Sequence, residues 1–483
     1  MKKVLAGLEP ARVFEIFEHL SSVPHGSGNT DAVSRLACEY AREQGLDAVR
    51  DALGNVIIKK GATPGFEGHP AVLLQAHLDM VCAATPGEGI DMARDPVKLV
   101  TNGEEIWADR TSLGADDMIG VACALAAACD PDAVHPPLEI LLTIDEETGM
   151  DGAEGLDPSM ISARRLINLD SEDEGVITAG CAGGRTLAGR LPLKRRRLPA
   201  DCEFLRVKLS GLQGGHSGAE IDRERGNSNL LAARIICEIA EFRPRLCAFS
   251  GGTFDNVIPS ETIFTLALPA ATSKSAAEAI ERSAARIGEE YAASEPGFTV
   301  EVSPAARQPS AVTEEDTLRA AGMLSLLPNG VMNMNIELGG LVETSLSTGG
   351  VHLDGGILTF RTLVRSSAPV SRKNEIARRV AAIAALHGAT VKPEGDFPAW
   401  IYRSDSPLLR TAREAYKRVS GTDARVYATH GGLECGILAD KLEGLDCVSI
   451  GPDMRDIHST GETLNVASVG RLYRYLLEIL KSL

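Results

Sequence analysis

Short apolar runs that end in polar residues recur in the N-terminal part of the chain. Three of them are residues 72–75 before His77, residues 138–144 before the acidic triplet 145–147, and residues 166–169 before Asp170. Runs of this length are typical of buried strands in a parallel sheet. Because the carboxyl ends of parallel strands lie at one edge, where open α/β sheets bind ligands, we expect these polar residues to lie together.

Helical spacing of apolar residues alternates with these strands. Residues 11–20 and 31–43 repeat apolar positions at helical intervals, and residues 56–60 have the pattern of another strand. Residues 118–129 are rich in alanine and other small apolar residues, which predicts a buried helix after a turn at Asp116. Alternating strands and helices are the mark of a layered α/β domain.

The pattern changes near residue 187. A glycine-rich stretch at 180–184 and a basic run at 193–199 come first. Residues 203–392 then mix strands of alternating polarity with long alanine-rich helices at 275–291 and 372–386. This mixture predicts α+β units inserted into the first domain. From residue 400 the helix–strand alternation resumes, and we expect it to end with His458.

We therefore predict an α/β protein with two domains. Residues 1–187 and 396–483 would form one domain, with a mixed, mainly parallel sheet flanked by helices. Residues 188–395 would form an inserted α+β domain. A chain of 483 residues is too long for one hydrophobic core, which agrees with this division.

Composition and charge exclude several classes of protein. A formal net charge of −17 argues against a nucleic-acid-binding protein, which would present a basic face. No apolar run is long enough to span a bilayer, and only a short apolar stretch follows residues 1–3, so neither a membrane anchor nor a signal peptide is expected. The ten cysteines include no Cys-x-x-Cys pair, so a cytoplasmic protein with reduced thiols is expected.

Histidine and acidic residues at the expected sheet edge suggest metal chemistry. His77 and Asp79 would point the same way in an extended segment, as a metal-bound imidazole and its carboxylate acceptor do, although a strand-end histidine beside an unrelated acid is the alternative. Three adjacent acids at 145–147 would repel one another unless cations neutralise them, but a solvated loop could also carry them. Asp116 or Asp117 could simply cap the following helix, and Asp170 begins an acidic run that could be a solvated face.

The combination of these motifs resembles the M20 metallopeptidases. Within that family it is most similar to the bacterial aminoacyl-histidine dipeptidases, also called Xaa-His dipeptidases or peptidase D. The matching segments extend over most of the chain and are VPHGSGN at 23–29, QAHLDMV at 75–81, LGAD at 113–116, DEETG at 145–149, NLDSE at 168–172, GGHSG at 214–218, NVIP at 256–259, GLECG at 432–436, IGP at 450–452 and IHS at 457–459. Three segments depart from the usual pattern, at 117–118, 347–350 and 430–431. None of them includes a metal ligand of the family.

The resemblance implies a site with two divalent metal ions, zinc above all, with cobalt or manganese able to substitute. In the family pattern Asp116 would bridge the two ions, His77 and Asp170 would complete one of them, and Glu147 and His458 the other. Such ions lower the pKa of a shared water from about 16 to about 7. Glu146 would be the general base that takes the proton of this water, and Asp79 would orient His77.

The same resemblance implies roles for four residues outside the metal set. His216, in a glycine-flanked segment of the insertion, would hold the tetrahedral oxyanion or the substrate carboxylate. Asn256 and Arg365 would grip the C-terminal carboxylate of the substrate, and Glu434 would receive its free α-amino group. Without the resemblance, His216 could be an ordinary loop histidine, Arg365 an exposed structural arginine and Glu434 a local cap.

The expected function is the hydrolysis of dipeptides and other short unblocked peptides, and the resemblance implies histidine at the C-terminal position. An N-deacylase or carboxypeptidase acting on blocked amino acids would use the same site, and a requirement for a free amine would separate the two. A non-catalytic metal-binding protein of this fold would have lost the base or a ligand, whereas all are present in this chain. The insertion could serve as a lid, as a homodimer surface or as a substitute for a second subunit's lid, and no nucleic-acid or membrane partner is expected.

Overall fold

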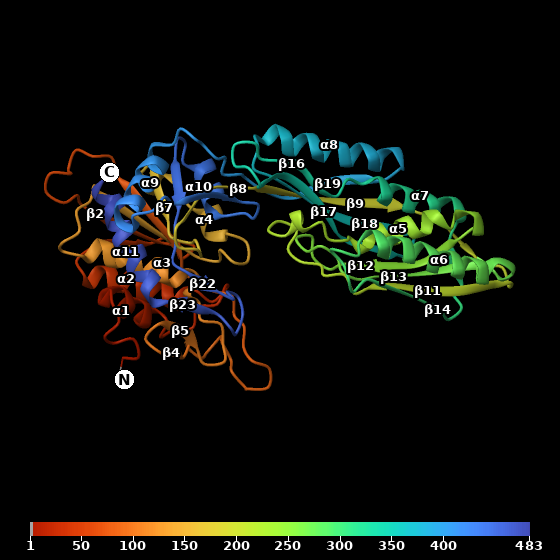
Figure 1. The fold of residues 1–483 in the computed structure, drawn as a ribbon, viewed down its shortest axis with the longest axis horizontal. Coiled ribbons are helices and arrows are strands. Elements are labelled where there is room, and N and C mark those ends of the chain that lie inside the picture. The colour runs from red at the N-terminus through yellow and green to blue at the C-terminus, as the bar shows by residue number, and fades with distance from the viewer. Residues whose placement is uncertain (1–2) are drawn as a thin grey trace. The chain divides into compact units, whose positions relative to one another are not determined.

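The computed structural model describes residues 3–483, which form two compact units (Figure 1). Residues 1 and 2, which begin the segment considered above as a signal peptide, lie outside the described residues. The first unit contains the chain up to Cys181 together with Tyr402–Ala428 and Leu433–Leu483. The second unit contains Ala182–Ile401 and Thr429–Gly432. Each unit has its own hydrophobic core.

An eight-stranded sheet forms the centre of the first unit. In spatial order its strands are β1 (Asp47–Arg50), β2 (Val56–Lys60), β6 (Leu138–Thr143), β3 (Val72–His77), β7 (Arg165–Asn168), β21 (Asp446–Ser449), β8 (Val176–Cys181) and β20 (Arg425–Thr429). The four central strands β6, β3, β7 and β21 run parallel, whereas β1, β2 and β8 pair antiparallel with their neighbours. The predicted mixed, mainly parallel sheet is confirmed.

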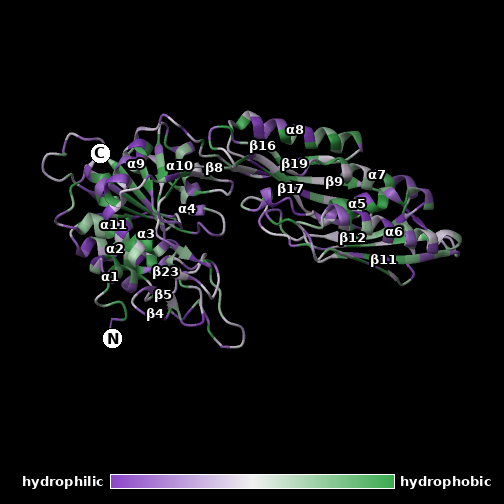
Figure 2. Ribbon diagram, in the orientation of Figure 1, coloured by the Kyte–Doolittle hydropathy of each residue, from purple (hydrophilic) through white to green (hydrophobic). Residues whose placement is uncertain are grey.

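Helices pack against this sheet through apolar faces. They are α1 (Ala11–Leu20), α2 (Asp31–Glu43), α3 (Ala115–Cys129), α4 (Asp151–Gly155), α9 (Pro407–Ser420), α10 (Glu434–Lys441) and α11 (Val466–Lys481). Helix α3 contacts β3 and β6 and is buried along nearly its whole length, which explains its small apolar residues; Figure 2 shows it mainly in the colours of hydrophobic residues. Helix α9 contacts β21 and β8, and α11 contacts both α9 and α3.

A small four-stranded sheet completes the first unit. Its order is β22 (Met454–Arg455), β23 (Thr463–Asn465), β5 (Glu105–Ala108) and β4 (Leu99–Thr101). Strand β23 and helix α11 follow His458, so the expectation that the helix–strand alternation ends with His458 is wrong. The apolar spacing of residues 466–480 accounts for α11, which buries Leu472, Leu476 and Ile479.

The second unit is built on an antiparallel sheet with helices. The main strands, in spatial order, are β14 (Thr299–Pro304), β11 (Cys202–Ser210), β13 (Thr262–Pro269), β12 (Arg245–Gly251), β17 (Val342–Asp354), β18 (Ile357–Ser366), β9 (Gly183–Pro192) and β19 (Thr390–Phe397), with β16 (Gly330–Met334) also paired to β17. A separate two-stranded sheet joins β10 (Arg195–Arg197) and β15 (Ser310–Val312). The helices are α5 (Ser228–Glu238), α6 (Ala270–Glu290), α7 (Glu314–Leu326) and α8 (Val370–Leu386). Figure 2 shows hydrophobic and hydrophilic residues alternating along α8, which buries one side against β9, β18 and β19.

The chain passes from one unit to the other between β8 and β9. Strand β8 belongs to the first unit's sheet and β9 to the second unit's sheet, so the crossing falls at Ala182, within the glycine-rich stretch. The predicted crossing lies at 187/188 and the predicted return at 395/396, whereas the units divide at 181/182 and 401/402. Both differences arise because strands β9 and β19 extend the inserted sheet beyond the predicted limits.

Within the described residues, no helix is both long enough and apolar enough to cross a membrane. None of the ten cysteines in this part of the chain forms a disulfide.

Candidate metal centre

Three neighbouring strands bring polar residues to one edge of the first unit's sheet. His77 is the last residue of β3, Glu146 and Glu147 follow the end of β6, and Asp170 follows the end of β7. Because β3 lies between β6 and β7 and runs parallel to both, the three carboxyl ends share one edge. The expectation that these residues lie together is confirmed.

Asp116 lies between two histidines. Its Oδ1 is 3.3 Å from His77 Nε2, and its Oδ2 is 3.1 Å from His458 Nε2. Gly114 precedes helix α3 in the left-handed conformation, with φ 69°, and no side chain caps this helix. The interpretation of Asp116 as a helix cap is therefore wrong, and each of its carboxylate oxygens instead faces a different imidazole.

Asp116 belongs to two groups of donor atoms. Asp170 Oδ1 lies 3.3 Å from His77 Nε2, and Glu147 Oε1 lies 2.7 Å from His458 Nε2. Donor atoms of His77, Asp116 and Asp170 all lie within 4.8 Å of one another, and the same holds for Asp116, Glu147 and His458. Two such groups with a common carboxylate offer nitrogen and oxygen donors to a pair of divalent cations.

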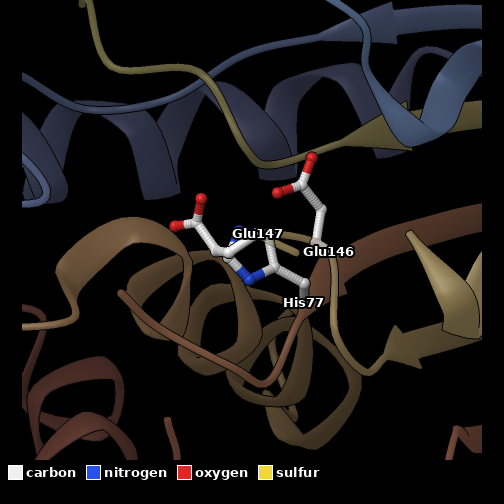
Figure 3. A group of neighbouring side chains, drawn as sticks. All are labelled: His77, Glu146 and Glu147. Carbon is white, nitrogen blue, oxygen red and sulfur yellow. The ribbon is translucent and has the colours of Figure 1, made fainter. Parts of the chain in front are cut away.

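Glu146 reaches the same region as Glu147. Together with His77 the two glutamates form a third group of donor atoms within 4.8 Å, and Figure 3 draws their carboxylates apart, on either side of the His77 ring. Burial, together with repulsion from Glu434 and Glu147, raises the pKa of the Glu146 carboxyl to about 8. A carboxyl with such a pKa can both take and release a proton near neutral pH.

Acidic side chains crowd this edge of the sheet. Burial raises the pKa of Asp170 well above its ordinary value, and the Asp116 and Glu146 carboxylates add to the effect. Burial and the Asp170 charge raise the pKa of Asp117 in the same way, and Asp117 Oδ1 is buried without a hydrogen-bond partner among the described residues. Because cations stabilise buried carboxylates that repel one another, the residues present fit a metal pair.

Asp79 holds the loop that carries the two glutamates. Its carboxylate accepts hydrogen bonds from Ser27 Oγ at 2.7 Å and from the backbone N–H groups of Glu146 and Glu147 at 3.0 and 3.3 Å. His77 Nδ1 lies 3.0 Å from the Asp79 main-chain oxygen and 3.4 Å from its Oδ1. The main-chain oxygen is thus the nearer acceptor for the ring, while the carboxylate fixes the glutamate loop.

Glu462, which was not among the predicted site residues, joins two of the loops that carry candidate ligands. Its two carboxylate oxygens accept hydrogen bonds from the backbone N–H groups of residues 113, 114 and 115, at 2.8, 3.0 and 2.8 Å. The residue is 2% exposed. One buried carboxylate therefore ties the loop of His458 to the turn that presents Asp116. The only signal in the sequence is an acidic residue four positions after His458. That spacing does not predict which backbone N–H groups its carboxylate accepts from.

The predicted substrate-binding residues belong to both units. His216, Asn256 and Arg365 lie in the second unit, and Glu434 lies in the first. Arg365, on β18, has its Nη2 3.3 Å from His216 Nε2. Asn256 is exposed, and its main-chain oxygen accepts a hydrogen bond of 2.8 Å from the N–H of Ser217, next to His216.

His216 and Arg365 present hydrogen-bond donors to the same place. Because the Ala219 N–H donates to His216 Nδ1 at 3.0 Å, the neutral ring carries its hydrogen on Nε2, beside the guanidinium. Burial and the charge of Arg365 lower the pKa of His216 to about 4, which keeps the ring neutral. Arg365 is 4% exposed, so the interpretation as an exposed arginine is wrong, and its Nε has no hydrogen-bond partner among the described residues. Two such donors without an acceptor suit an anionic group.

Glu434 is buried at the first turn of α10. Its Oε2 accepts hydrogen bonds from Gln75 Nε2 and Thr143 Oγ1, both at 2.6 Å, so it pairs with β3 and β6 and is not a local cap. Its Oε1 is buried without a hydrogen-bond partner in the described part of the chain. Burial raises the pKa of the Glu434 carboxyl to about 7.

Replacing Glu462 by glutamine is expected to weaken metal binding and lower the thermal stability. Glutamine keeps one acceptor oxygen and turns an NH₂ group toward a backbone N–H, so at least one charge-assisted hydrogen bond is lost, at a cost of about 3 kcal/mol. Competition with a chromophoric chelator measures the zinc affinity, and calorimetry measures the unfolding temperature. The exposed Glu443→Gln is the control for the charge change. Unchanged affinity and stability in Glu462→Gln would show that the carboxylate does not hold the Asp116 turn.

Comparisons with known proteins agree with this geometry. The model of Peptidase family M20/M25/M40 matches residues 73–482. A cytosol non-specific dipeptidase of Escherichia coli (strain K12) is 36% identical over 480 residues, which cover 99% of each chain. The crystal structure of an aminoacylhistidine dipeptidase from Vibrio alginolyticus has a TM-score of 0.89 and 35% identity, over 99% of this chain and 98% of that one. The chain therefore belongs to Peptidase family M20/M25/M40 and is a metal-dependent hydrolase.

Proposed function

We propose that the protein is a dipeptidase that hydrolyses unblocked dipeptides, Xaa-His dipeptides among them, with two divalent metal ions. The names of the two full-length relatives support the substrate class. The single observation that carries the metal pair is the Asp116 carboxylate, whose two oxygens face His77 and His458 respectively. The crowding of buried carboxylates around it gives a physical reason for two cations.

The proposed ligands are Asp116 for both ions, His77 and Asp170 for one, and Glu147 and His458 for the other. Zinc suits this set of imidazole and carboxylate donors, and cobalt or manganese would also bind it. When bound, the ions would supply Lewis acidity to a water molecule and to the peptide carbonyl.

Glu146 is the proposed general base. Glu147 completes one of the two ligand groups, whereas Glu146 is not needed for either. The Glu146 carboxylate lies close to His77. Its raised pKa suits a group that takes a proton from water and gives it to the departing amine. Asp79 is a positioning residue in this proposal, because its carboxylate holds the backbone of the base and of Glu147.

His216 and Arg365 are the proposed donors to the anionic part of the substrate. The Nε2–H of His216 and the guanidinium of Arg365 are both donors, so neither accepts a hydrogen bond from the other. Both can donate to a carboxylate or a developing oxyanion. Asn256 adjoins the His216 segment through its backbone and is proposed as a further donor.

Glu434 is the proposed partner of the substrate's α-ammonium group. Its Oε1 is buried without a hydrogen-bond partner among the described residues, whereas Oε2 is held by two strands. A cation at Oε1 would favour the ionised form of this carboxyl, which burial otherwise disfavours. We also propose that the enzyme acts in the cytoplasm, since the Escherichia coli relative is named a cytosol enzyme and none of the described cysteines forms a disulfide.

A panel of peptides tests the proposed function. After removal of bound metal and addition of zinc, cobalt or manganese, β-alanyl-histidine and other unblocked dipeptides should be cleaved. The N-acetylated and C-terminally amidated forms should be slower by about two orders of magnitude or more, because each leaves a buried charged group without its partner. Equal or faster cleavage of N-acetylated substrates would instead indicate an N-deacylase or carboxypeptidase.

Two substitutions are expected to remove turnover while zinc content stays at the wild-type level. Glu146→Gln removes the proposed base and should lower kcat by about two to four orders of magnitude. His216→Ala removes a donor to developing charge and should lower kcat by about two to three orders of magnitude. Steady-state kinetics and metal analysis on the same samples give both readouts, with Glu443→Gln as control. Loss of metal in Glu146→Gln would make Glu146 a ligand, and normal turnover in His216→Ala would make His216 an ordinary loop histidine.

A further inference from the structure

A hollow of about 780 Å³ lies in the second unit, where β10, β15, the start of β12 and the start of α7 meet. Its lining includes four cationic residues, Lys194, Arg196, Arg197 and Arg245. The volume falls in the range of small-molecule binding sites. Because the protein as a whole carries a net charge of −17, a local excess of cations needs a physical reason.

The side chains of these four cations have no hydrogen-bond or ion-pair partner among residues 3–483. Neighbouring arginines contrast with them. Arg195 donates to the main-chain oxygens of Cys247, Gly355 and Ser310, Arg243 pairs with Glu314 at 2.8 Å, and Arg319 pairs with Asp316 at 2.8 Å. The hollow therefore gathers cations that the fold itself does not neutralise.

Acidic residues do not balance this charge. Glu314 and Glu315 also line the hollow, but Glu314 is engaged by Arg243. Asp316 is buried and accepts hydrogen bonds from Arg319 and from the N–H of Lys194. Glu315 is thus the one lining carboxylate without a partner among the described residues, beside four cations. The hollow therefore attracts anions.

Backbone hydrogen bonds hold the segment that carries Lys194 and Arg196. The Lys194 N–H donates to Asp316 Oδ2, and the Lys194 carbonyl accepts from the N–H of Thr313. Arg196 pairs in register with Ala311 across the β10–β15 ladder. Cations that project from a fixed backbone lose less entropy on binding than cations on a mobile loop.

Apolar residues also line the hollow. Ala311 and Val312 are buried, and Leu198 and Leu318 are half-buried. Guanidinium groups match phosphate oxygens through paired N–H donors, and apolar lining residues accommodate a flat organic group. We propose that this hollow binds an organic diphosphate or triphosphate, such as a nucleoside diphosphate, at a site separate from the metal centre of the first unit.

The test is titration calorimetry of the full-length, zinc-loaded protein with ADP, pyrophosphate and adenosine. ADP should bind, and its affinity should fall as salt is added, because the attraction is between exposed charges. Pyrophosphate and adenosine should each bind more weakly than ADP, since each lacks one part of the ligand. No binding of ADP at millimolar concentration would overturn the proposal, as would adenosine binding as tightly as ADP.

Variants locate the site. Arg196→Gln/Arg245→Gln should weaken ADP binding by about tenfold or more, because two charge-assisted hydrogen-bonding groups are lost. Lys194→Gln/Arg197→Gln is a second pair that removes the same charge. Arg282→Gln/Arg372→Gln is the matched control, since both arginines are exposed and lie outside the hollow. ADP binding that persists in both hollow variants but is lost in His458→Ala would place the phosphates at the metal centre and overturn the proposal.

Discussion

The carboxylate of Asp116 is the constraint on which the candidate metal centre depends. Its two oxygens face two imidazoles, one at the end of β3 and one near the C-terminus of the chain. The fold secures this arrangement from several sides. Parallel pairing of β3 with β6 and β7 brings His77, the glutamate loop and Asp170 to one edge, and Glu462 ties the Asp116 turn to the loop of His458. Gly114, at φ 69°, permits the sharp entry into α3.

Uncompensated charge is concentrated in each unit, with opposite sign. At the sheet edge of the first unit, buried carboxylates raise one another's pKa, and cations would relieve that repulsion. In the second unit, the Arg365 Nε has no partner among the described residues, and the cations around the β10–β15 hollow lack acidic partners as well. In the first unit the buried, unpaired charge costs stability, whereas Lys194, Arg196 and Arg197 in the second unit are exposed to solvent, and the fold does not require them to gather. Ligands of opposite charge give both a physical reason.

The sequence predicted those parts of the structure that depend on local patterns. Residues 11–20 and 31–43 form α1 and α2 as predicted, because their apolar spacing leads to one buried face, and the apolar runs before His77 and Asp170 form parallel strands. Contacts between distant segments could not be predicted. Glu462 bonds to residues 113–115, which are remote in the sequence, so the spacing of nearby residues does not predict these contacts. The burial of Arg365 likewise depends on the pairing of β18 with β17 and β9. The limits of the inserted unit were missed for the same reason, since β9 and β19 pair with each other across the whole insertion.

The most direct test of the central claim is the metal content of the purified protein, measured by mass spectrometry. The same measurement is made on its Asp116→Asn, Asp170→Asn and Glu147→Gln variants. A carboxylate shared by two ions predicts two ions per chain in the wild type. Asp170→Asn and Glu147→Gln should each weaken mainly one ion, whereas Asp116→Asn should weaken both. An Asp116→Asn variant that keeps one ion with wild-type affinity would contradict the shared carboxylate, and so would a wild-type protein that binds a single ion.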